Sequence, residues 1–190
     1  KPMRVLLIVD VQNDFLPGGA LAVPHGDEVI SVINRLMPKM DVIVASKDWH
    51  PINHGSFAES HQGKKPGEFV QLGGLDQVLW PVHCVQETPG ADFSPALNQD
   101  SIHHIVYKGQ EKDVDSYSAF FDNGQRKNTG LDSYLKKKGA KELYIVGLAT
   151  DYCVKYTTLD ALRLGYKAFV ITDACRGVNL SEGDDISSLN

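Results

Sequence analysis

Near its start the chain reads VLLIVD over residues 5–10, a continuous apolar run closed by an acid. Residues 27–40 then carry apolar side chains at helical spacing, and residues 42–45 form a second apolar run. An apolar run this short and unbroken is typical of a strand that is buried on both faces. The stretch therefore predicts a strand, a helix and a second strand, the repeating unit of an α/β fold.

The same alternation returns in the second half of the chain. We expect three further strands, at residues 102–107, 143–146 and 168–172, and two helices, around residues 131–138 and from about 152 to 164. Strands that alternate with helices in this way form a mainly parallel sheet with helices on both faces. The sequence therefore predicts an α/β sandwich.

Residues 49–74 interrupt this pattern, because they are rich in Pro, Gly, His and Ser and show no sustained periodicity. We interpret them as the first part of a loop-rich insertion, over about residues 49–100, that covers one edge of the sheet. A chain of 190 residues with 42% hydrophobic content is long enough for one substantial core. We expect a single domain over residues 1–190 that contains this insertion.

The composition argues against two classes of partner. The net charge is −5 and the densest positive run, residues 136–138, lies at a predicted helix end, so nucleic acid is not expected. Every apolar stretch is too short for a membrane span, and the N-terminal region lacks the long apolar segment of a signal peptide. The three cysteines have neither disulfide-framework nor zinc-finger spacing, which indicates reduced thiols. We therefore expect a cytoplasmic protein without a membrane partner.

Polar side chains follow the predicted strands where these strands end. Asp10 follows the first strand, Asp48 the second and Lys108 the third. Residues 147–153 follow the fourth strand and include Cys153. The carboxyl ends of parallel strands meet at one edge of the sheet, where such folds bind their ligands. The sequence therefore predicts an active site at this edge.

Cys153 is the candidate nucleophile. It lies at the start of a predicted helix, directly after the turn of residues 147–151. A helix N-terminus lowers the pKa of a thiol, and its free N–H groups can receive an oxyanion. The alternative is a small buried side chain, which is what most free cysteines are. Cys84 and Cys175 fit that structural interpretation.

Asp10 and Lys108 would stand beside Cys153 if their strands are neighbours. A carboxylate can take the thiol proton and pass it to a leaving group, and an ammonium can hold the thiolate. A structural ion pair at the strand ends is the alternative. The sequence places no histidine beside Cys153, so it does not support a papain-like pair.

A candidate metal site surrounds the end of the second strand. Asp48 and His50 lie two apart in an extended chain, so both side chains can face one ion, and His83 could complete the set. One carboxylate and two imidazoles suit zinc, which we favour, and also manganese or iron. The spacing is common, and the alternative is that these histidines are only solvated. His54 and His61 are reserve ligands.

Four apolar or aromatic side chains lie in loops after the strands or in the insertion. These residues, which could line a pocket, are Phe15, Leu21, Trp80 and Tyr117. The alternative is that they pack the insertion against the sheet.

Six segments of the chain carry a family resemblance. They read DVQNDF (residues 10–15), KDWHP (47–51), NHGSF (53–57), WPVHCV (80–85), DSYSAFF (115–121) and GLATDYCV (147–154). They closely resemble the bacterial nicotinamidase/pyrazinamidase family of the isochorismatase-like hydrolases, which implies a three-layer sandwich fold. Related isochorismatases lack the nucleophilic cysteine, so Cys153 favours hydrolysis of an amide over hydrolysis of a vinyl ether.

The resemblance implies a role for each matching position. It implies a catalytic triad of Asp10, Lys108 and Cys153. It implies metal ligands at Asp48, His50 and His83, and some members also use a histidine in the region of His54. The peptide between Leu148 and Ala149 corresponds to a cis peptide, which would aim the N–H of Ala149, with that of Cys153, at the oxyanion. Phe15 and Trp80 match residues that sandwich a pyridine ring.

The implied activity is hydrolysis of nicotinamide to nicotinic acid and ammonia through a cysteine thioester, a step of NAD salvage in pyridine nucleotide biosynthesis. The metal would orient the ring, and pyrazinamide is a second expected substrate. Two alternatives stay open: an amidohydrolase of the superfamily for a carbamoyl or ureido compound, and a catalytically silent metal-binding module. A homo-oligomer also stays open. Members usually continue after a segment like residues 173–180 with a helix and a strand, so we expect part of the sheet edge or a subunit contact to be absent.

Overall fold

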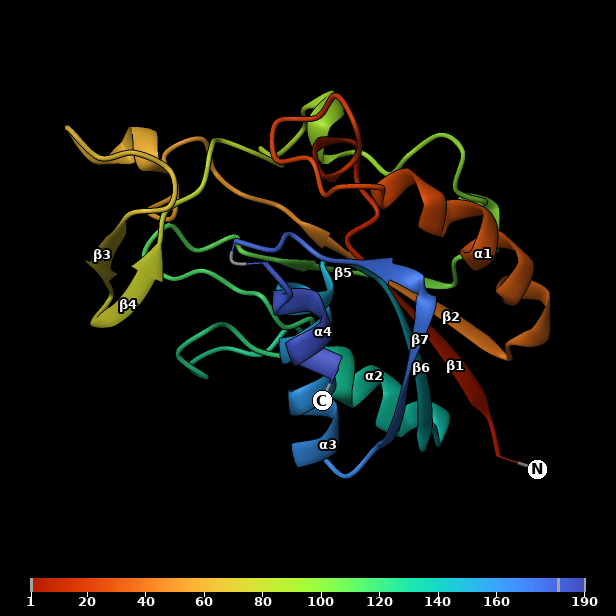
Figure 1. The fold of residues 1–190 in the computed structure, drawn as a ribbon. Helices are drawn as coiled ribbons and strands as arrows, with labels where there is room; N and C mark the ends of the chain where they lie inside the picture. The colour runs from red at the N-terminus through yellow and green to blue at the C-terminus, as the bar shows by residue number, and fades with distance from the viewer. Residues whose placement is uncertain (1, 181, 190) are drawn as a thin grey trace.

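Parallel strands form the central sheet of the computed structural model, which describes residues 2–180 and 182–189 (Figure 1). The strand order is β5-β2-β1-β6-β7, and every neighbouring pair is parallel. The strands have these bounds: β1 Arg4–Val9, β2 Val42–Asp48, β5 His104–Lys108, β6 Glu142–Leu148 and β7 Lys167–Arg176. The predicted mainly parallel α/β fold is confirmed, with the apolar run of residues 5–9 at its centre.

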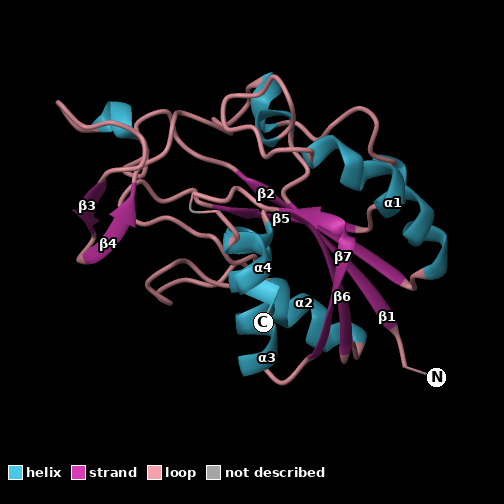
Figure 2. Cartoon of the chain, viewed as in Figure 1, coloured by secondary structure: helices cyan, strands magenta, loops and turns pink. Residues whose placement is uncertain are grey.

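Helices cover both faces of the sheet. α1 (Val29–Leu36) lies on one face, and α2 (Leu131–Lys138) and α3 (Lys155–Arg163) lie on the other (Figure 2). A fourth helix, α4 (Asp184–Leu189), packs against the turn that precedes α3. In the described residues, no helix is both long and apolar enough to cross a membrane.

Alternate side chains of β1 enter two separate cores. Leu6 and Ile8 pack in one cluster with side chains of α1, and Val5, Leu7 and Val9 pack in the other with side chains of α2. All five are at most 1% exposed. Because both faces of β1 are covered, the strand has no polar alternation, which explains the unbroken apolar run.

Two element boundaries near the candidate site differ from the prediction: the start of the helix that carries Cys153 and the end of β7. The helix expected from residue 152 begins earlier, as a π-helical turn over Thr150–Val154 that continues into α3. β7 is longer than the expected strand at 168–172, because a register irregularity opposite Ile145 and Gly147 lets it continue to Arg176. Both irregularities lie at the carboxyl end of β6, next to Cys153.

The insertion contains a hairpin that the sequence analysis missed. β3 (Phe69–Leu72) and β4 (Leu75–Val78) pair antiparallel. Gly73 and Gly74 connect them, with φ of 58° and 84°. Two glycines between short strands are a hairpin signal, but these strands are half polar and lack a clear buried face. The insertion also has short 3₁₀ helices: Ala58–Ser60, Pro89–Ala91 and Gln99–Ser101.

The sheet register brings the polar strand ends together. Asp48 of β2 pairs with Lys108 of β5, and Val9 of β1 pairs with both Ser46 and Gly147. Gly147 has φ of 119°, and a Cβ there would lie 2.1 Å from the carbonyl oxygen of Val9. Only glycine therefore lets β6 approach β1 at the point where the chain turns toward Cys153.

Candidate active site

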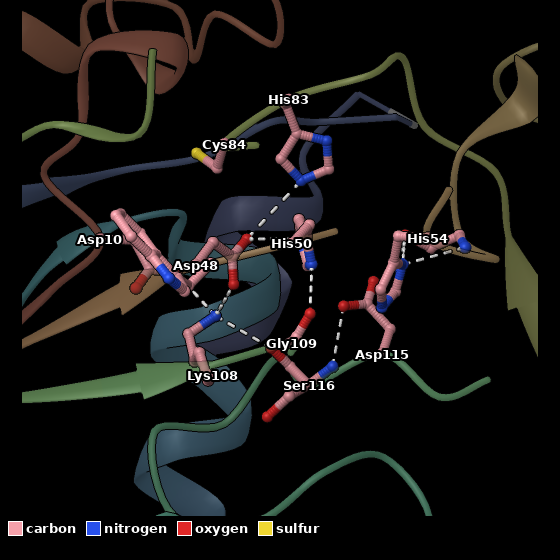
Figure 3. A network of polar contacts seen from close by, with 12 residues as sticks. Asp10, Asp48, His50, His54, His83, Cys84, Lys108, Gly109, Asp115 and Ser116 are labelled. Carbon is pink, nitrogen blue, oxygen red and sulfur yellow. Dashed lines mark hydrogen bonds and ion pairs between the residues drawn. The ribbon is translucent and has the colours of Figure 1, made fainter. Parts of the chain in front are cut away.

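Lys108 is the centre of the buried polar cluster at this edge of the sheet (Figure 3). Its Nζ lies 2.8 Å from Oδ2 of Asp10, 2.6 Å from Oδ1 of Asp48 and 3.3 Å from Sγ of Cys153. A fourth contact, of 2.9 Å, goes to the carbonyl oxygen of Ser116. The fold thus brings the three predicted catalytic residues into contact from β1, β5 and the turn after β6.

Buried hydrogen bonds fix the Asp10 carboxylate and the backbone of Asp48. The Asp10 N–H donates to the carbonyl oxygen of Ser46 at 3.2 Å, and the Ser46 hydroxyl donates to Oδ1 of Asp10 at 2.6 Å. The side-chain amide of Gln12 accepts the Asp48 N–H at 2.9 Å and donates to the Asp48 carbonyl oxygen at 2.8 Å. Ser46 and Gln12 are fully buried, so the Asp10 carboxylate and the backbone that carries Asp48 are held in place before a substrate binds.

Burial sets the protonation of the cluster. It raises the pKa of the Cys153 thiol well above its usual range, with Lys108 opposing the shift and Asp10 adding to it. Burial also raises the pKa of Asp10 against the attraction of Lys108. Lys108 loses solvation too, but Asp10 and Asp48 outweigh that loss and place its pKa well above its usual range. The expected lowering of the thiol pKa is therefore wrong for the resting site, because burial of the thiol disfavours its charged form and the neighbouring Asp10 and Asp48 add to that effect.

The turn after β6 places the candidate oxyanion groups. The peptide between Leu148 and Ala149 is cis, as the family resemblance implies. The N–H groups of Tyr152 and Val154 both donate to the carbonyl oxygen of Ala149, at 3.2 and 3.0 Å. Ala149 and Cys153 lie on the wall of one cavity. Their N–H groups are therefore the candidates for binding an oxyanion there.

Asp48, His50 and His83 form a compact group whose ligand atoms lie within 4.8 Å of one another. Oδ2 of Asp48 is 3.4 Å from Nε2 of His50 and 3.6 Å from Nε2 of His83. The other ring nitrogens donate to backbone, His50 Nδ1 to Gly109 at 2.7 Å and His83 Nδ1 to Pro81 at 2.8 Å. Nε2 of His50 is buried without a hydrogen-bond partner in the described part of the chain. Two oriented imidazoles beside a carboxylate fit a divalent cation.

His54, the reserve ligand, is bonded at both ring nitrogens. Nδ1 lies 2.8 Å from the hydroxyl of Ser56 and accepts the Ser56 N–H at 3.1 Å, and Nε2 donates to the carbonyl oxygen of Val114 at 3.1 Å. The ring packs on His50 with 4.3 Å between centroids. His61 likewise bonds a backbone carbonyl through Nε2, at 2.7 Å. His54 therefore packs beside Asp48, His50 and His83 with both of its ring nitrogens hydrogen-bonded. Together with His50 and Asp115 it forms a second group whose possible ligand atoms lie within 4.8 Å of one another.

An apolar cavity opens next to Cys153. All four predicted pocket residues line it: Phe15, Leu21, Trp80 and Tyr117. Asp48, His83 and Ala149 line the same cavity. The thiol of Cys153 and two of the candidate metal ligands, Asp48 and His83, therefore face the same cavity. Nε1 of Trp80 donates to the Tyr117 hydroxyl at 3.2 Å, which fixes both rings. The cavity suits a flat aromatic ring with a polar atom at its edge.

The sequence analysis missed five residues of the cavity wall: Val23, Asp115, Leu148, Tyr152 and Val178. Asp115 could have been found, because Asp115 and Tyr117 face this cavity while Val114 and Ser116 face another, the alternation of an extended segment. The Asp115 carboxylate also lies within 4.8 Å of ligand atoms of His50 and His54. Val178 could not have been found, because it reaches the cavity from a distant part of the chain.

Comparison with known proteins identifies the family of this chain and several similar proteins. The isochorismatase domain family matches residues 4–187. A nicotinamidase of Escherichia coli is 55% identical over 187 residues, which cover 96% of this chain and 87% of that protein. Among solved structures, an Acinetobacter baumannii nicotinamidase/pyrazinamidase superposes with a TM-score of 0.95 at 46% identity, over 100% of this chain and 91% of that one. A Pyrococcus horikoshii pyrazinamidase in complex with zinc superposes with a TM-score of 0.78 at 39% identity, over 99% of this chain and 93% of that one.

Proposed function

This chain belongs to the isochorismatase family, and we propose that it hydrolyses the carboxamide of nicotinamide to nicotinic acid and ammonia. The observation that carries the proposal is the single cavity onto which Cys153, the aromatic rings of Phe15 and Trp80, and Asp48 and His83 all face. An amide carbon can reach a thiol there while the attached ring stays between apolar walls. The similar nicotinamidases of E. coli and A. baumannii support the substrate.

Cys153 is the nucleophile of the first half-reaction. Its Sγ attacks the carboxamide carbon, the thiol proton passes to the Asp10 carboxylate, and the carbonyl π electrons move to oxygen. The N–H groups of Ala149 and Cys153 hydrogen-bond the resulting oxyanion. When the tetrahedral intermediate collapses, Asp10 returns the proton to the amide nitrogen and ammonia leaves. A thioester of nicotinic acid remains on Cys153.

Water completes the second half-reaction. Asp10, again ionised, takes a proton from water as the water oxygen attacks the thioester carbon, and the C–S bond then breaks. The thiolate of Cys153 takes back a proton as nicotinic acid leaves. Lys108 stays positively charged throughout, because its pKa lies well above its usual range. Since its Nζ contacts both Asp10 and Sγ, it stabilises whichever of the two is negative.

Asp48, His50 and His83 would hold one divalent metal ion, which we propose to be zinc. This donor set suits zinc and also manganese or iron, and the similar P. horikoshii pyrazinamidase was solved in complex with zinc. When bound, the ion supplies a Lewis-acid contact for the ring nitrogen of the substrate and so orients the ring. Pyrazinamide carries a ring nitrogen at the corresponding position, and we propose it as a second substrate.

Release of ammonia from nicotinamide by the purified, metal-loaded protein tests this function. We expect nicotinic acid and ammonia in equal amounts. A panel of carbamoyl and ureido compounds, assayed in parallel, separates this activity from that of other amidohydrolases. If the protein cleaves a ureido compound and leaves nicotinamide intact, the proposal is overturned.

A further inference from the structure

The carboxylate of Asp151 ties the turn that carries Cys153 to the C-terminal segment. Oδ1 accepts the N–H of Val178 at 2.9 Å, and Oδ2 accepts the N–H of Asn179 at 2.7 Å. Asp151 is 7% exposed, so both bonds are shielded from water. Hydrogen bonds to a charged acceptor are stronger than neutral ones, and two consecutive N–H groups fit the two oxygens in one arrangement. Asp151 therefore fixes the backbone of this distant segment.

The C-terminal segment folds back from this attachment onto the same turn. The side-chain oxygen of Asn179 accepts the Asp185 N–H at 2.9 Å, near the start of α4. A Cβ on Gly177 would lie 2.4 Å from Cβ of Asp185, so the backbone at Gly177 lies close against α4. α4 in turn packs against Thr150–Val154. The segment is thus held at both ends against the turn of the nucleophile.

One of the two residues held by Asp151 forms part of the substrate cavity. Val178 lines the cavity together with Ala149 and Cys153. The N–H that Oδ1 accepts belongs to Val178 itself, so this bond fixes the backbone of a residue that lines the cavity. We propose that Asp151 is a positioning residue for the wall of this cavity, and that through Val178 it sets which rings the enzyme accepts. The proposal rests on the nicotinamide hydrolysis proposed above.

A purely structural role for Asp151 makes a different prediction. An acid in the first turn of a helix is stabilised by the helix dipole, whatever the acid touches. Loss of that interaction would loosen the turn, displace Sγ and the candidate oxyanion N–H groups, and so lower kcat. Loss of the contact with Val178 would instead widen the cavity, which raises KM and relaxes selectivity. The split between KM and kcat therefore separates the two roles.

The experiment compares Asp151→Asn with Asp160→Asn in the metal-loaded protein. Asn keeps the shape of Asp151 but sets an NH₂ group against one of the two N–H donors. Asp160 is a matched control, since it is equally buried, lies in α3, contacts Arg163 at 3.3 Å and does not line the cavity. KM and kcat are measured for nicotinamide and for its 4-, 5- and 6-methyl derivatives, and folding is checked by circular dichroism.

For Asp151→Asn we expect KM for nicotinamide to rise on the order of tenfold, since a hydrogen bond to a charged group is lost, with a smaller change in kcat. At least one methylated amide should gain in kcat/KM relative to nicotinamide. Asp160→Asn should keep the wild-type KM and selectivity. A folded Asp151→Asn that loses kcat alone, or that keeps the wild-type selectivity, overturns the proposal.

Two further measurements keep the test decisive. If Asp151→Asn does not fold, Val178→Ala decides: relaxed ring selectivity supports the proposal, and wild-type selectivity overturns it. If the wild type releases no ammonia from nicotinamide, the proposed function has failed, and alkylation of Cys153 tests the positioning role of Asp151 independently. Folded Asp151→Asn should then admit a bulky maleimide faster than wild type does, relative to iodoacetamide, and an unchanged ratio would overturn that role.

Discussion

Lys108 balances two buried carboxylates, Asp10 and Asp48, with one positive charge. Removing one partner of a buried ionic cluster is costly, because the charges left behind have already lost their solvation. Burial raises the pKa of the Cys153 thiol, and in the mechanism that we propose the thiolate forms as its proton moves to Asp10. At the scale of single residues, the proposed chemistry therefore depends on one mobile proton shared by Sγ and a carboxylate.

Replacement of the nucleophile is the first test at this scale. Cys153→Ala should abolish ammonia release, because no other thiol stands at the start of this helix, and should leave the fold and metal content intact. Cys84→Ala is a matched control, since Cys84 is also a buried free thiol, and it should stay active. The measurement is ammonia release with metal analysis of each variant. Substantial turnover by Cys153→Ala would exclude a thioester intermediate.

Replacement of the proton carrier is the second test. Asp10→Asn keeps the shape of the side chain but removes the base, so we expect kcat to fall by the ~10² to 10⁴ typical of general acid–base catalysis. Ser46→Ala removes one hydrogen bond to Oδ1 and keeps the carboxylate, so its loss should be much smaller. Steady-state kinetics on nicotinamide compare the two. A fall of less than tenfold for Asp10→Asn would make Asp10 structural.

β6 and the turn after it are the elements on which the site is built. β6 pairs with β1 on one side and with β7 on the other, and its carboxyl end carries the cis peptide and the turn of the nucleophile. The register irregularity in β7 lies opposite this end, so that Cys175 pairs with Gly147. Substitutions that alter the packing of this end should therefore affect stability and the site together.

Gly147 tests the close approach of β1 and β6. Gly147→Ala should destabilise the protein by several kcal/mol, because its Cβ would lie 2.1 Å from the carbonyl oxygen of Val9 at φ of 119°. Gly139→Ala is the matched control: φ is 74°, and a Cβ there meets no atom within 4 Å. Its cost should be about 1 kcal/mol, that of the backbone conformation alone. Urea denaturation measures both, and equal losses would refute the steric argument.

Cys175 in β7 predicts a loss of stability at alkaline pH. Burial raises its pKa from 9.0 to about 12. The folded state therefore keeps the proton where the unfolded state releases it, so this contribution is complete below about pH 9 and is lost as pH rises toward 12. Cys175→Ala should lose less stability over this interval than wild type, by on the order of a few kcal/mol. Urea midpoints on both sides of the interval measure the difference, and parallel curves would contradict it.

At the scale of the whole molecule, the site depends on four regions that meet at one edge of the sheet. The strands and their carboxyl ends supply Asp10, Asp48 and Lys108, the turn after β6 supplies Cys153, and the loops between β2 and β5 supply His83 and Trp80. The C-terminal segment adds Val178 to the cavity wall. Because residues from all four regions line one cavity, the cavity exists only in the assembled fold.

Removal of the metal tests whether the ion orients the substrate ring while the strand ends and the turn after β6 keep Cys153 reactive. If the ion orients the ring, chelation should mainly destroy nicotinamide binding and leave Cys153 reactive, because the thiol and Asp10 are held by other bonds. Benzamide, which lacks the ring nitrogen, should be a far poorer substrate even with metal. Alkylation of Cys153 and turnover of both amides before and after chelation are the measurements. Normal turnover by folded, metal-free protein would contradict the orienting role.

The sequence by itself determined the layers of the fold and the residue types of the site. Unbroken apolar runs at residues 5–9 and 143–146 mark strands covered on both faces, because such runs have no solvated side. Asp10, Lys108 and Cys153 could be assigned to one edge, because parallel strands all end there. The burial of a strand is a local property that the pattern of apolar residues reveals. The shared edge follows from the common direction of parallel strands.

Only the tertiary structure decided which of these residues meet, and in what state. The order β5-β2-β1-β6-β7 puts Lys108 against Asp10 and Cys153, and nothing in a single strand encodes its neighbour. Both nitrogens of His54 are already bonded, and the thiol of Cys153 has a raised pKa, because groups distant in the chain surround them. Val178 reaches the cavity through its bond to Asp151. Contacts of this kind depend on packing between remote segments, which local periodicity does not record.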